Sequence, residues 1–303
     1  MSEFYGESAD NIFMESKPIT FNEDTIEEFG VEHKWHNVKM LDSLVTGRET
    51  LIQMIERPGW GIACYMDNSI QSCEVDERIY HESLVHPVMA SVKCRQRVMI
   101  VGGGEGATAR EVLKWPDVEQ VDMYEWDEDV VKLFKTSYPQ WGRGAWDDPR
   151  LSLRHIDIFE SICHHPHTAN KYDVIIIDLF DPTEENRPLW KILLKNLHGW
   201  ITTEGSIVMY AGMRNILTSK QPYQILAETL TEHYEVTKGF MFYDFTLNKN
   251  ITPYRVYIPS FSGESSFLLL TKNKMPDIDF DNLSKHRSHI SPDVWTSYKT
   301  LNW

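Results

Sequence analysis

The chain has 303 residues, of which 42% are hydrophobic and 25% are charged, a composition typical of a folded globular protein. It holds 30 Lys and Arg against 45 Asp and Glu, so its formal net charge is −15. Such an excess of negative charge disfavours nucleic acids and anionic membranes as partners and favours cations. No apolar run approaches the roughly 20 residues that are needed to span a bilayer.

The first 22 residues are acidic and polar and lack the pattern of a signal peptide. The four cysteines, Cys64, Cys73, Cys94 and Cys163, form no C-x-x-C motif. We therefore expect reduced thiols in a cytoplasmic protein, with paired disulfides as the alternative.

The N-terminal part of the chain predicts a small antiparallel β domain. Residues 1–43 have no clear periodicity and are interpreted as a partly ordered arm. Three short apolar runs separated by turn residues are predicted strands: residues 51–55, 62–66 and 70–75. Together with a linking helix that begins at residue 76, they form a predicted β-hairpin domain over residues 44–93.

From residue 94 to residue 303 the pattern changes to alternating strands and helices. The predicted strands are, in chain order, 98–101, 119–124, 151–156, 174–177, 206–210, 240–245 and 266–270. The runs at 98–101 and 174–177 are apolar throughout, as expected for parallel strands covered on both faces. This alternation predicts an α/β fold with a doubly wound sheet.

Two carboxylates follow the predicted strand 174–177. Asp178 and Asp181 lie in the segment DLFDP, in which Pro182 prevents the strand from continuing. Open α/β sheets bind their ligands at the carboxyl ends of their strands. A pair of carboxylates at that position favours a cationic ligand.

A glycine-rich loop, GGGEG at residues 102–106, follows the predicted strand 98–101 and opens a helix. Glycines there allow a ligand to approach the backbone closely. Glu125 ends the next strand, 19 residues after the loop, where a carboxylate can accept both hydroxyls of a ribose. Asp157 follows the third strand, where an adenine amine could be held. These features predict an adenosine-containing ligand, and a tight turn with an incidental acid is the alternative.

The loop by itself does not identify the nucleotide. The spacing G-x-G-x-x-A from residue 104 also matches the dinucleotide fingerprint, which leaves Asp157 unexplained. Glu105 would repel a pyrophosphate, and it would repel the carboxylate of S-adenosylmethionine in a methyltransferase. A donor with a bare ammonium group would be attracted by it.

The predicted linking helix contains Tyr80, His81 and His86. The two histidines are five residues apart and do not share a helix face as the zinc motif H-E-x-x-H requires, so no metal site is expected. The segment 164–167 (HHPH) is interpreted as a solvated loop. Tyr80 and His81 are either site residues or amphipathic core residues.

Three blocks of sequence carry a family resemblance. They are DNSIQ at 67–71 with DERIYHE at 76–82, GGGEGATAR at 102–110, and DVIIIDLFDP at 173–182. They are similar to the motifs DGxxQ…DExxYHE, GGGDG(x)xxR and DVIIxDxxDP of the spermidine synthase (aminopropyltransferase) family. The segments YHESLVHP, GGGEGATARE, DLFDP and IPSF most resemble the thermospermine synthases of that family.

The resemblance implies an N-terminal β domain followed by a Rossmann-like domain of the methyltransferase type, in a homodimer or homotetramer. It implies transfer of the aminopropyl group of decarboxylated S-adenosylmethionine to a polyamine, with release of 5′-methylthioadenosine and no further cofactor. The closest branch implies conversion of spermidine to thermospermine. Spermidine or spermine synthesis on another acceptor, norspermidine formation, a methyltransferase, and a donor-binding chain without turnover are the alternatives.

The resemblance also implies roles for five acids at matching positions. Asp178 corresponds to the proton acceptor, and Asp181 to its acceptor-binding partner. Glu105 corresponds to the acid that holds the donor's amine. Glu125 corresponds to the ribose-binding acid, and Asp157 to the acid on the adenine side.

Five further residues complete the predicted site. Tyr80 and His81 match the pair at which donor and acceptor meet, and Tyr80 is expected to orient the acceptor amine. Gly102 and Gly104 belong to the donor-binding loop, and Gln71 is assigned to substrate binding.

Several positions near the predicted acceptor site depart from the family's pattern. Thr50 replaces a donor-binding Gln, and Arg255 replaces the Tyr of putrescine-using members. Phe180 is bulkier than the usual Ala or Ser, and the segment 183–188 lacks the usual glycine. Within that segment, Glu184 or Glu185 is expected to meet a distant ammonium group of the acceptor.

Overall fold

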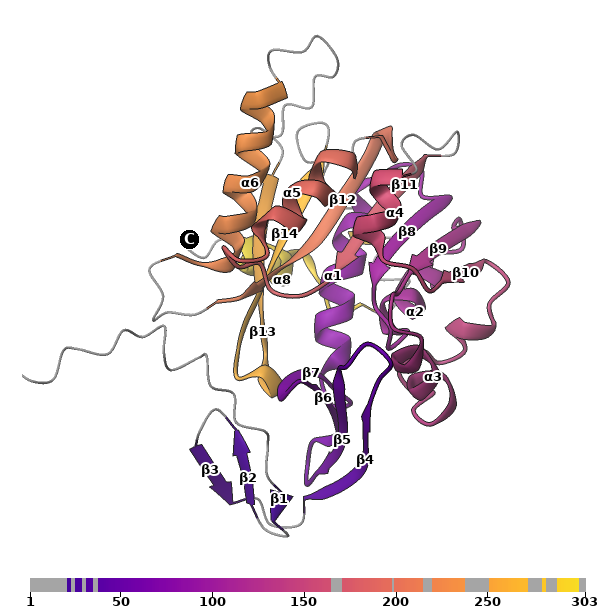
Figure 1. Ribbon diagram of the computed structural model, residues 1–303. Helices are drawn as coiled ribbons and strands as arrows, with labels where there is room; N and C mark the ends of the chain where they lie inside the picture. The colour runs from indigo at the N-terminus through magenta and orange to yellow at the C-terminus, as the bar shows by residue number, and fades with distance from the viewer. Residues whose placement is uncertain are drawn as a thin grey trace, which may run out of the picture. The chain divides into compact units, whose positions relative to one another are not determined.

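The computed structural model (Figure 1) describes residues 21–22, 25–28, 31–34, 38–164, 171–197, 199–214, 220–237, 251–271, 280–281 and 288–299. The chain divides into two compact units. The first comprises Met1–Glu77 and Asn215–Ser219, and the second comprises Arg78–Arg214 and Lys220–Trp303. This division differs from the predicted domain boundary at residue 93, because the linking helix belongs almost entirely to the second unit.

The first unit contains two antiparallel sheets. The smaller sheet has three strands, β1 (Phe21–Asn22), β2 (Thr25–Glu28) and β3 (Val31–Lys34). The larger sheet has four strands in sequential order, β4 (Lys39–Val45), β5 (Leu51–Arg57), β6 (Gly61–Met66) and β7 (Ser69–Cys73). Strand β4 begins inside the stretch that was predicted as an arm. The hairpins after it follow the predicted apolar runs.

The second unit is built on a seven-stranded sheet with the order β10-β9-β8-β11-β12-β14-β13. Its strands are β8 (Arg97–Gly102), β9 (Gln120–Tyr124), β10 (Leu151–Arg154), β11 (Tyr172–Asp178), β12 (Ile201–Met213), β13 (Ile251–Ile258) and β14 (Gly263–Thr271). The first five strands of this order pair in parallel, and β14 and β13 are antiparallel. The sheet and its helices, together with the small antiparallel domain, confirm the predicted fold class.

Helices of the second unit precede, connect and follow these strands. They are α1 (Glu77–Ser91), α2 (Ala107–Leu113), α3 (Glu128–Thr136), α4 (Ile158–His164), α5 (Arg187–Leu197), α6 (Pro222–Thr237) and α8 (Pro292–Lys299), with short 3-10 helices η2 (Ala145–Asp147) and η4 (Pro259–Phe261). Within the described ranges, no helix has the length and apolar character needed to cross a membrane.

The edge strand β13 was not predicted from the sequence. It contains Pro253, which pairs with Leu268 of β14. Proline cannot donate to a sheet ladder and is tolerated where the missing N–H faces away from the neighbouring strand, which is possible at an edge. The predicted strand at 240–245 lies outside the described residues.

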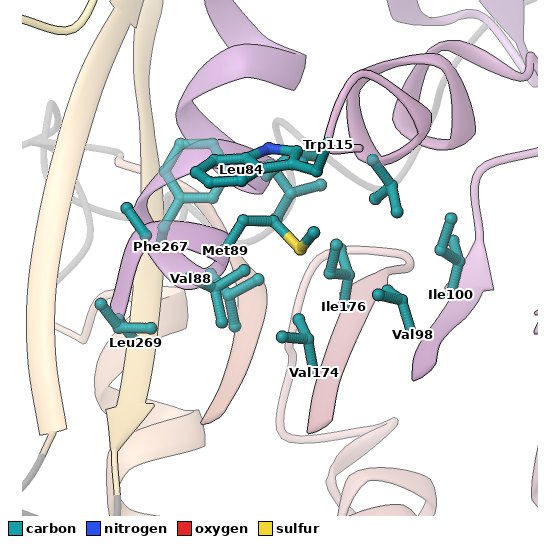
Figure 2. Close-up of a cluster of buried hydrophobic side chains, with 14 of the residues drawn as sticks. Leu84, Val88, Met89, Val98, Ile100, Trp115, Val174, Ile176, Phe267 and Leu269 are labelled. Carbon is teal, nitrogen blue, oxygen red and sulfur yellow. The ribbon is translucent and has the colours of Figure 1, made fainter. Parts of the chain in front are cut away.

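Both faces of the seven-stranded sheet are covered, which explains its continuous apolar strands. Val98 and Ile100 of β8 pack into one hydrophobic cluster, and Met99 and Val101 pack into the other. Figure 2 shows the first cluster, in which side chains from β8, β11, β14 and α1 meet around Trp115. Alternate residues of one strand thus serve two cores, as expected for a parallel sheet between two helical layers.

Helix α1 contains a proline in its interior. Pro87 has no N–H group to donate to the carbonyl of Ser83, one helical turn earlier. The hydroxyl of Tyr254, from β13, donates to that carbonyl at 2.8 Å. A side chain from the edge strand therefore replaces the hydrogen bond that α1 lacks.

Candidate functional site

Asp178 is the last residue of β11 and has both carboxylate oxygens hydrogen-bonded. The Tyr80 hydroxyl donates to Oδ1 at 2.7 Å, and the Thr108 hydroxyl donates to Oδ2 at 2.8 Å. Tyr80 comes from α1 and Thr108 from the first turn of α2, so three elements meet at one carboxylate. The two bonds hold the plane of the carboxylate, and each oxygen retains a lone pair for a further donor.

Tyr80 acts here as a hydrogen-bond donor. Burial raises the pKa of Tyr80 well above its usual value, and the neighbouring charge of Asp178 raises it further. The phenol therefore keeps its proton at neutral pH. The structure brings Tyr80 into contact with Asp178, although the two residues are 98 positions apart.

Asp181 is held in a similar way by a second tyrosine. The hydroxyl of Tyr210, on β12, donates to Asp181, and the backbone N–H of Met213 donates to Oδ2 at 3.4 Å. Burial raises the pKa of Asp181 above its usual value, and the Tyr210 bond partly opposes this. The rings of Tyr80 and Tyr210 lie 5.7 Å apart between their centroids. Two tyrosines in contact thus each orient one aspartate.

The glycine loop brings its backbone close to these acids. Gly102 pairs with Asp178 across the sheet and has φ 84°, and a Cβ there would lie 2.0 Å from the carbonyl oxygen of Asp178. At Gly104 a Cβ would lie 2.8 Å from Val130 Cγ1 and 3.0 Å from Glu125 Oε2. Both positions require glycine because of the close approach.

Glu105 projects from the same loop toward α1. Its Oε1 lies 3.5 Å from Nε2 of His81. Its Oε2 is buried and has no hydrogen-bond partner among the described residues. Because a buried carboxylate oxygen without a donor is costly, this atom fits a cationic ligand group.

Glu125 and Asp157 follow the neighbouring strands β9 and β10. Glu125 accepts hydrogen bonds from the backbone N–H groups of Asp127, Trp126 and Gly104. Burial nevertheless raises the pKa of Glu125 to about 7. Asp157 accepts from the backbone N–H at the start of α4 with Oδ1 at 2.8 Å. Both acids therefore lie at the carboxyl ends of adjacent strands, as predicted.

The comparisons with known proteins agree with this geometry. A spermine/spermidine synthase domain matches residues 77–282, which is more than half of the chain. The chain belongs to the spermine/spermidine synthase family.

Curated relatives in this family are named as polyamine aminopropyltransferases. Polyamine aminopropyltransferase 1 of Hyperthermus butylicus is 34% identical over 245 residues, which cover 77% of this chain and 76% of the relative. The polyamine aminopropyltransferase of Prochlorococcus marinus subsp. pastoris is 42% identical over 134 residues, which cover 44% of this chain and 46% of the relative.

Solved spermidine synthases share the fold. A spermidine synthase in complex with the transition-state analogue AdoDATO has a TM-score of 0.74 at 22% identity, covering 90% of this chain and 89% of that chain. The spermidine synthase of Thermotoga maritima has a TM-score of 0.72 at 21% identity, covering 90% of this chain and 88% of that one. At this identity the likeness establishes the family's fold.

The sequence did not single out Thr108 and Tyr210, whose hydroxyls donate to Asp178 and Asp181. Thr108 lies within the GGGEGATAR block. Tyr210 ends the predicted strand 206–210, which belongs to β12, the neighbour of the strand that ends at Asp178. The sequence shows only that Thr108 follows the glycine loop and that Tyr210 ends a predicted strand, which does not distinguish a site hydroxyl from a core residue. Gln71 lies in β7, in the first unit, where its side-chain amide donates to the carbonyl of Ser69. Its assignment stays a prediction.

Phe180 contacts two aromatic residues of this family member. Its ring stacks on Phe159 at 6.0 Å and meets Trp190 edge-on at 5.6 Å, while 43% of its surface stays exposed. Phe180, which lies between Asp178 and Asp181 in the sequence, therefore has a bulky ring that is partly exposed.

Two charged residues of the expected acceptor region already have partners. Glu184 pairs with Lys220 and Arg187, so its charge is balanced by the chain itself. Arg255 pairs with Glu264 at 2.7 Å.

No metal centre is found among the described residues. They contain no group of three His, Cys, Asp or Glu side chains that could hold a metal ion. His86 instead forms a buried pair, with Nε2 3.1 Å from Glu111 Oε2, and accepts from the Trp115 indole with Nδ1 at 3.2 Å.

Proposed function

We propose that this chain is a polyamine aminopropyltransferase that uses decarboxylated S-adenosylmethionine, with spermidine as acceptor and thermospermine and 5′-methylthioadenosine as products. Family membership and the names of the curated relatives support aminopropyl transfer. The choice of spermidine rests on the sequence resemblance. The observation that carries the proposal is the carboxylate of Asp178, which Tyr80 and Thr108 hold beside the glycine loop.

The donor is held by three acids in this proposal. Glu105, with its unpartnered buried Oε2, binds the ammonium of the aminopropyl arm. Glu125 accepts the ribose hydroxyls, and Asp157 holds the adenine amine with the oxygen that its backbone bond leaves available. The donor lacks the carboxylate of S-adenosylmethionine, which the charge of Glu105 would repel.

Asp178 acts as the general base. An alkyl ammonium has a reference pKa near 10, so the acceptor nitrogen must lose a proton before it can attack. That proton passes to Asp178 while Tyr80 orients the nitrogen. A bond forms between the nitrogen and the methylene next to sulfur, the carbon–sulfur bond breaks, and its electron pair neutralises the sulfonium as methylthioadenosine leaves. Asp181, fixed by Tyr210, binds a neighbouring ammonium of the acceptor.

The reaction class is tested by offering both donors. Purified full-length protein is incubated with decarboxylated S-adenosylmethionine or with S-adenosylmethionine, and with putrescine, spermidine or agmatine as acceptor. Mass and chromatographic analysis of the amines is expected to show a gain of one aminopropyl group on spermidine, eluting as thermospermine. Spermine as the product of spermidine would refute the proposed product, transfer to putrescine or agmatine in place of spermidine would refute the proposed acceptor, and a methylated amine would refute the reaction.

The role of Asp178 is tested by the Asp178→Asn variant. The amide cannot accept the proton, so kcat should fall far below that of the wild type, while the affinity for methylthioadenosine stays nearly unchanged because the donor-side acids are intact. If the variant keeps more than about a tenth of wild-type kcat, a difference of only ~1.4 kcal/mol, the base assignment is wrong.

Quaternary structure and location follow the same resemblance. A homodimer or homotetramer in the cytoplasm, with no nucleic acid or membrane partner, is part of the proposal. Sedimentation of the purified chain measures the first of these properties.

A further inference from the structure

Two separate sets of contacts join the end of the chain to the catalytic helix α1. The segment Ser288–Lys299 lies beyond residue 282, where the match to the family domain ends. Its helix α8 packs beside β13, as Figure 1 shows. One set of contacts is polar and reaches Glu82, and the other is aromatic and reaches Tyr80.

The polar set is centred on the buried carboxylate of Glu82. Glu82 is 1% exposed and accepts from the backbone N–H of His289 at 2.7 Å and from its Nδ1 at 2.8 Å, both at Oε2. Arg78 donates to the other oxygen at 2.9 Å. Burial by itself would raise the pKa of Glu82, but the bonds from His289 outweigh it and lower this pKa to about 2. The carboxylate is therefore charged, and its hold on His289 is a strong, charge-assisted one.

The protonation of His289 follows from its partners. A carboxylate only accepts, so Nδ1 of His289 must carry a proton and donate to Glu82. The other nitrogen, Nε2, lies 2.8 Å from the hydroxyl of Tyr298 in α8 and 3.4 Å from the hydroxyl of Ser83 in α1. His289 thus connects α8 to α1, with Nδ1 on Glu82 of α1 and Nε2 between Tyr298 of α8 and Ser83 of α1.

The aromatic set runs from α8 to the tyrosine that holds Asp178. Trp295, 3% exposed, meets the ring of Tyr254 at 4.9 Å. Tyr254 stacks on Phe267 at 5.2 Å, and Phe267 lies 5.4 Å from Tyr80. Tyr254 also donates to the carbonyl of α1 that Pro87 leaves without a helical partner.

We propose that His289 is a positioning residue: through Glu82 it fixes the helix that carries Tyr80 and His81, so that the Tyr80 hydroxyl stays on the base Asp178. This inference rests on the proposed function. Glu82 is one residue from His81 and two from Tyr80, on the same helix. A side chain displaced by ~1 Å can reduce turnover on the order of 10²-fold even when the changed residue is remote from the reaction.

The test uses the two amide replacements of His289 in the full-length chain. The side-chain nitrogen of Asn stands at the same number of bonds from Cβ as Nδ1, and that of Gln at the same number as Nε2. His289→Asn should therefore keep the bond to Glu82 and retain kcat within about twofold. His289→Gln should lower kcat about tenfold or more, within the range that misplacement produces. The Kd of methylthioadenosine should change by less than about twofold in both.

Two further variants separate positioning from general destabilisation. Ile290→Val removes one buried methylene beside His289 and should lower the midpoint of urea unfolding without changing kcat. In a Tyr80→Phe background, His289→Gln should produce less than about twofold additional loss, because both changes remove the same placement of the hydroxyl. If His289→Gln does not fold, Tyr298→Phe is used in its place. This variant removes the hydroxyl that contacts His289 and should lower kcat as well, by a smaller factor.

The outcomes distinguish the inference from the proposed function. Equal kcat in wild type, His289→Asn and His289→Gln overturns the inference, as does full additivity with Tyr80→Phe. A wild-type chain that transfers no aminopropyl group to any acceptor overturns the proposed function instead. In that case the hydrogen exchange of α1 backbone amides in the same variants still reports whether His289 holds the helix.

Discussion

The raised pKa of Glu125 predicts that donor-side binding depends on pH. Glu125 is 8% exposed and its pKa is raised to about 7, chiefly by burial. Ribose hydroxyls donate hydrogen bonds, which a carboxylate accepts better than a carboxylic acid does. Binding of methylthioadenosine should therefore favour the ionised form and release a proton from Glu125.

The size of the change in Kd follows from the pKa of Glu125 in the free protein. With a pKa of about 7, roughly one tenth of the free protein has Glu125 ionised at pH 6, and roughly nine tenths at pH 8. The Kd of methylthioadenosine should therefore be about tenfold weaker at pH 6 than at pH 8. The folding stability of the free protein changes with pH in the opposite direction: it falls as the pH rises, whereas ligand binding becomes tighter. Because the pKa is raised from 4.5, the contribution of Glu125 to stability is complete below pH 4.5 and is lost as the pH rises through about 7, by ~3 kcal/mol at 1.36 kcal/mol per pH unit.

Isothermal titration calorimetry measures the Kd of methylthioadenosine and the number of protons released on binding. Titrations at pH 6, 7 and 8 in two buffers of different ionisation enthalpy should show uptake by the buffer of nearly one proton per ligand at pH 6 and almost none at pH 8. Glu125→Gln should bind weakly with the same Kd at all three pH values. Asp157→Asn is the matched control, since it alters the adenine side and should keep the pH dependence. A wild-type Kd that does not change between pH 6 and pH 8, or an equal slope in Glu125→Gln, would refute the reasoning.

Three further changes test other parts of the site. Gly104→Ala should displace the carboxylate of Glu125, because the added Cβ would lie 3.0 Å from Oε2. Calorimetry should then show methylthioadenosine binding weakened about tenfold or more, and an unchanged Kd would contradict this reasoning. Tyr210→Phe removes the donor to Asp181 and should raise the KM for the acceptor several-fold while the Kd of methylthioadenosine stays the same; a change confined to that Kd would contradict it. Glu111→Gln breaks the buried ion pair between Glu111 and Arg110 and should lower the free energy of unfolding by ~3–5 kcal/mol in urea titrations at pH 7, and a loss below ~1 kcal/mol would show that the pair is not needed.

Much of the fold was predictable because its signals are local. The strands β8 and β11 are continuous apolar runs, and the loop after β8 is rich in glycine, so each could be found without knowledge of its neighbours. Strand β13 was missed because Pro253 argues against a strand unless the strand is known to lie at an edge. Edge position is a property of the sheet order and is not encoded in the strand's own residues.

The sequence predicted the acids of the candidate site, but it did not predict the hydroxyl groups that donate hydrogen bonds to them. Asp178 and Glu125 stand at the ends of predicted strands, and the order of strands brings those ends together. The hydroxyls of Thr108 and Tyr210 carry no such mark, because a threonine or a tyrosine near a strand end is ordinary in any core. Only the folded chain shows that each donates to an aspartate.

The sequence by itself determined the alternation of strands and helices from β8 to β11, the glycine loop and the acids that follow the strands, since these depend on residue type and spacing along the chain. The tertiary structure decided what those acids can do. Burial, which only packing produces, raises the pKa of Glu125 to about 7, and contacts across 98 and 207 positions of the chain place Tyr80 on Asp178 and His289 on Glu82. Desolvation and long-range hydrogen bonds depend on distances in space, which spacing in the sequence does not specify.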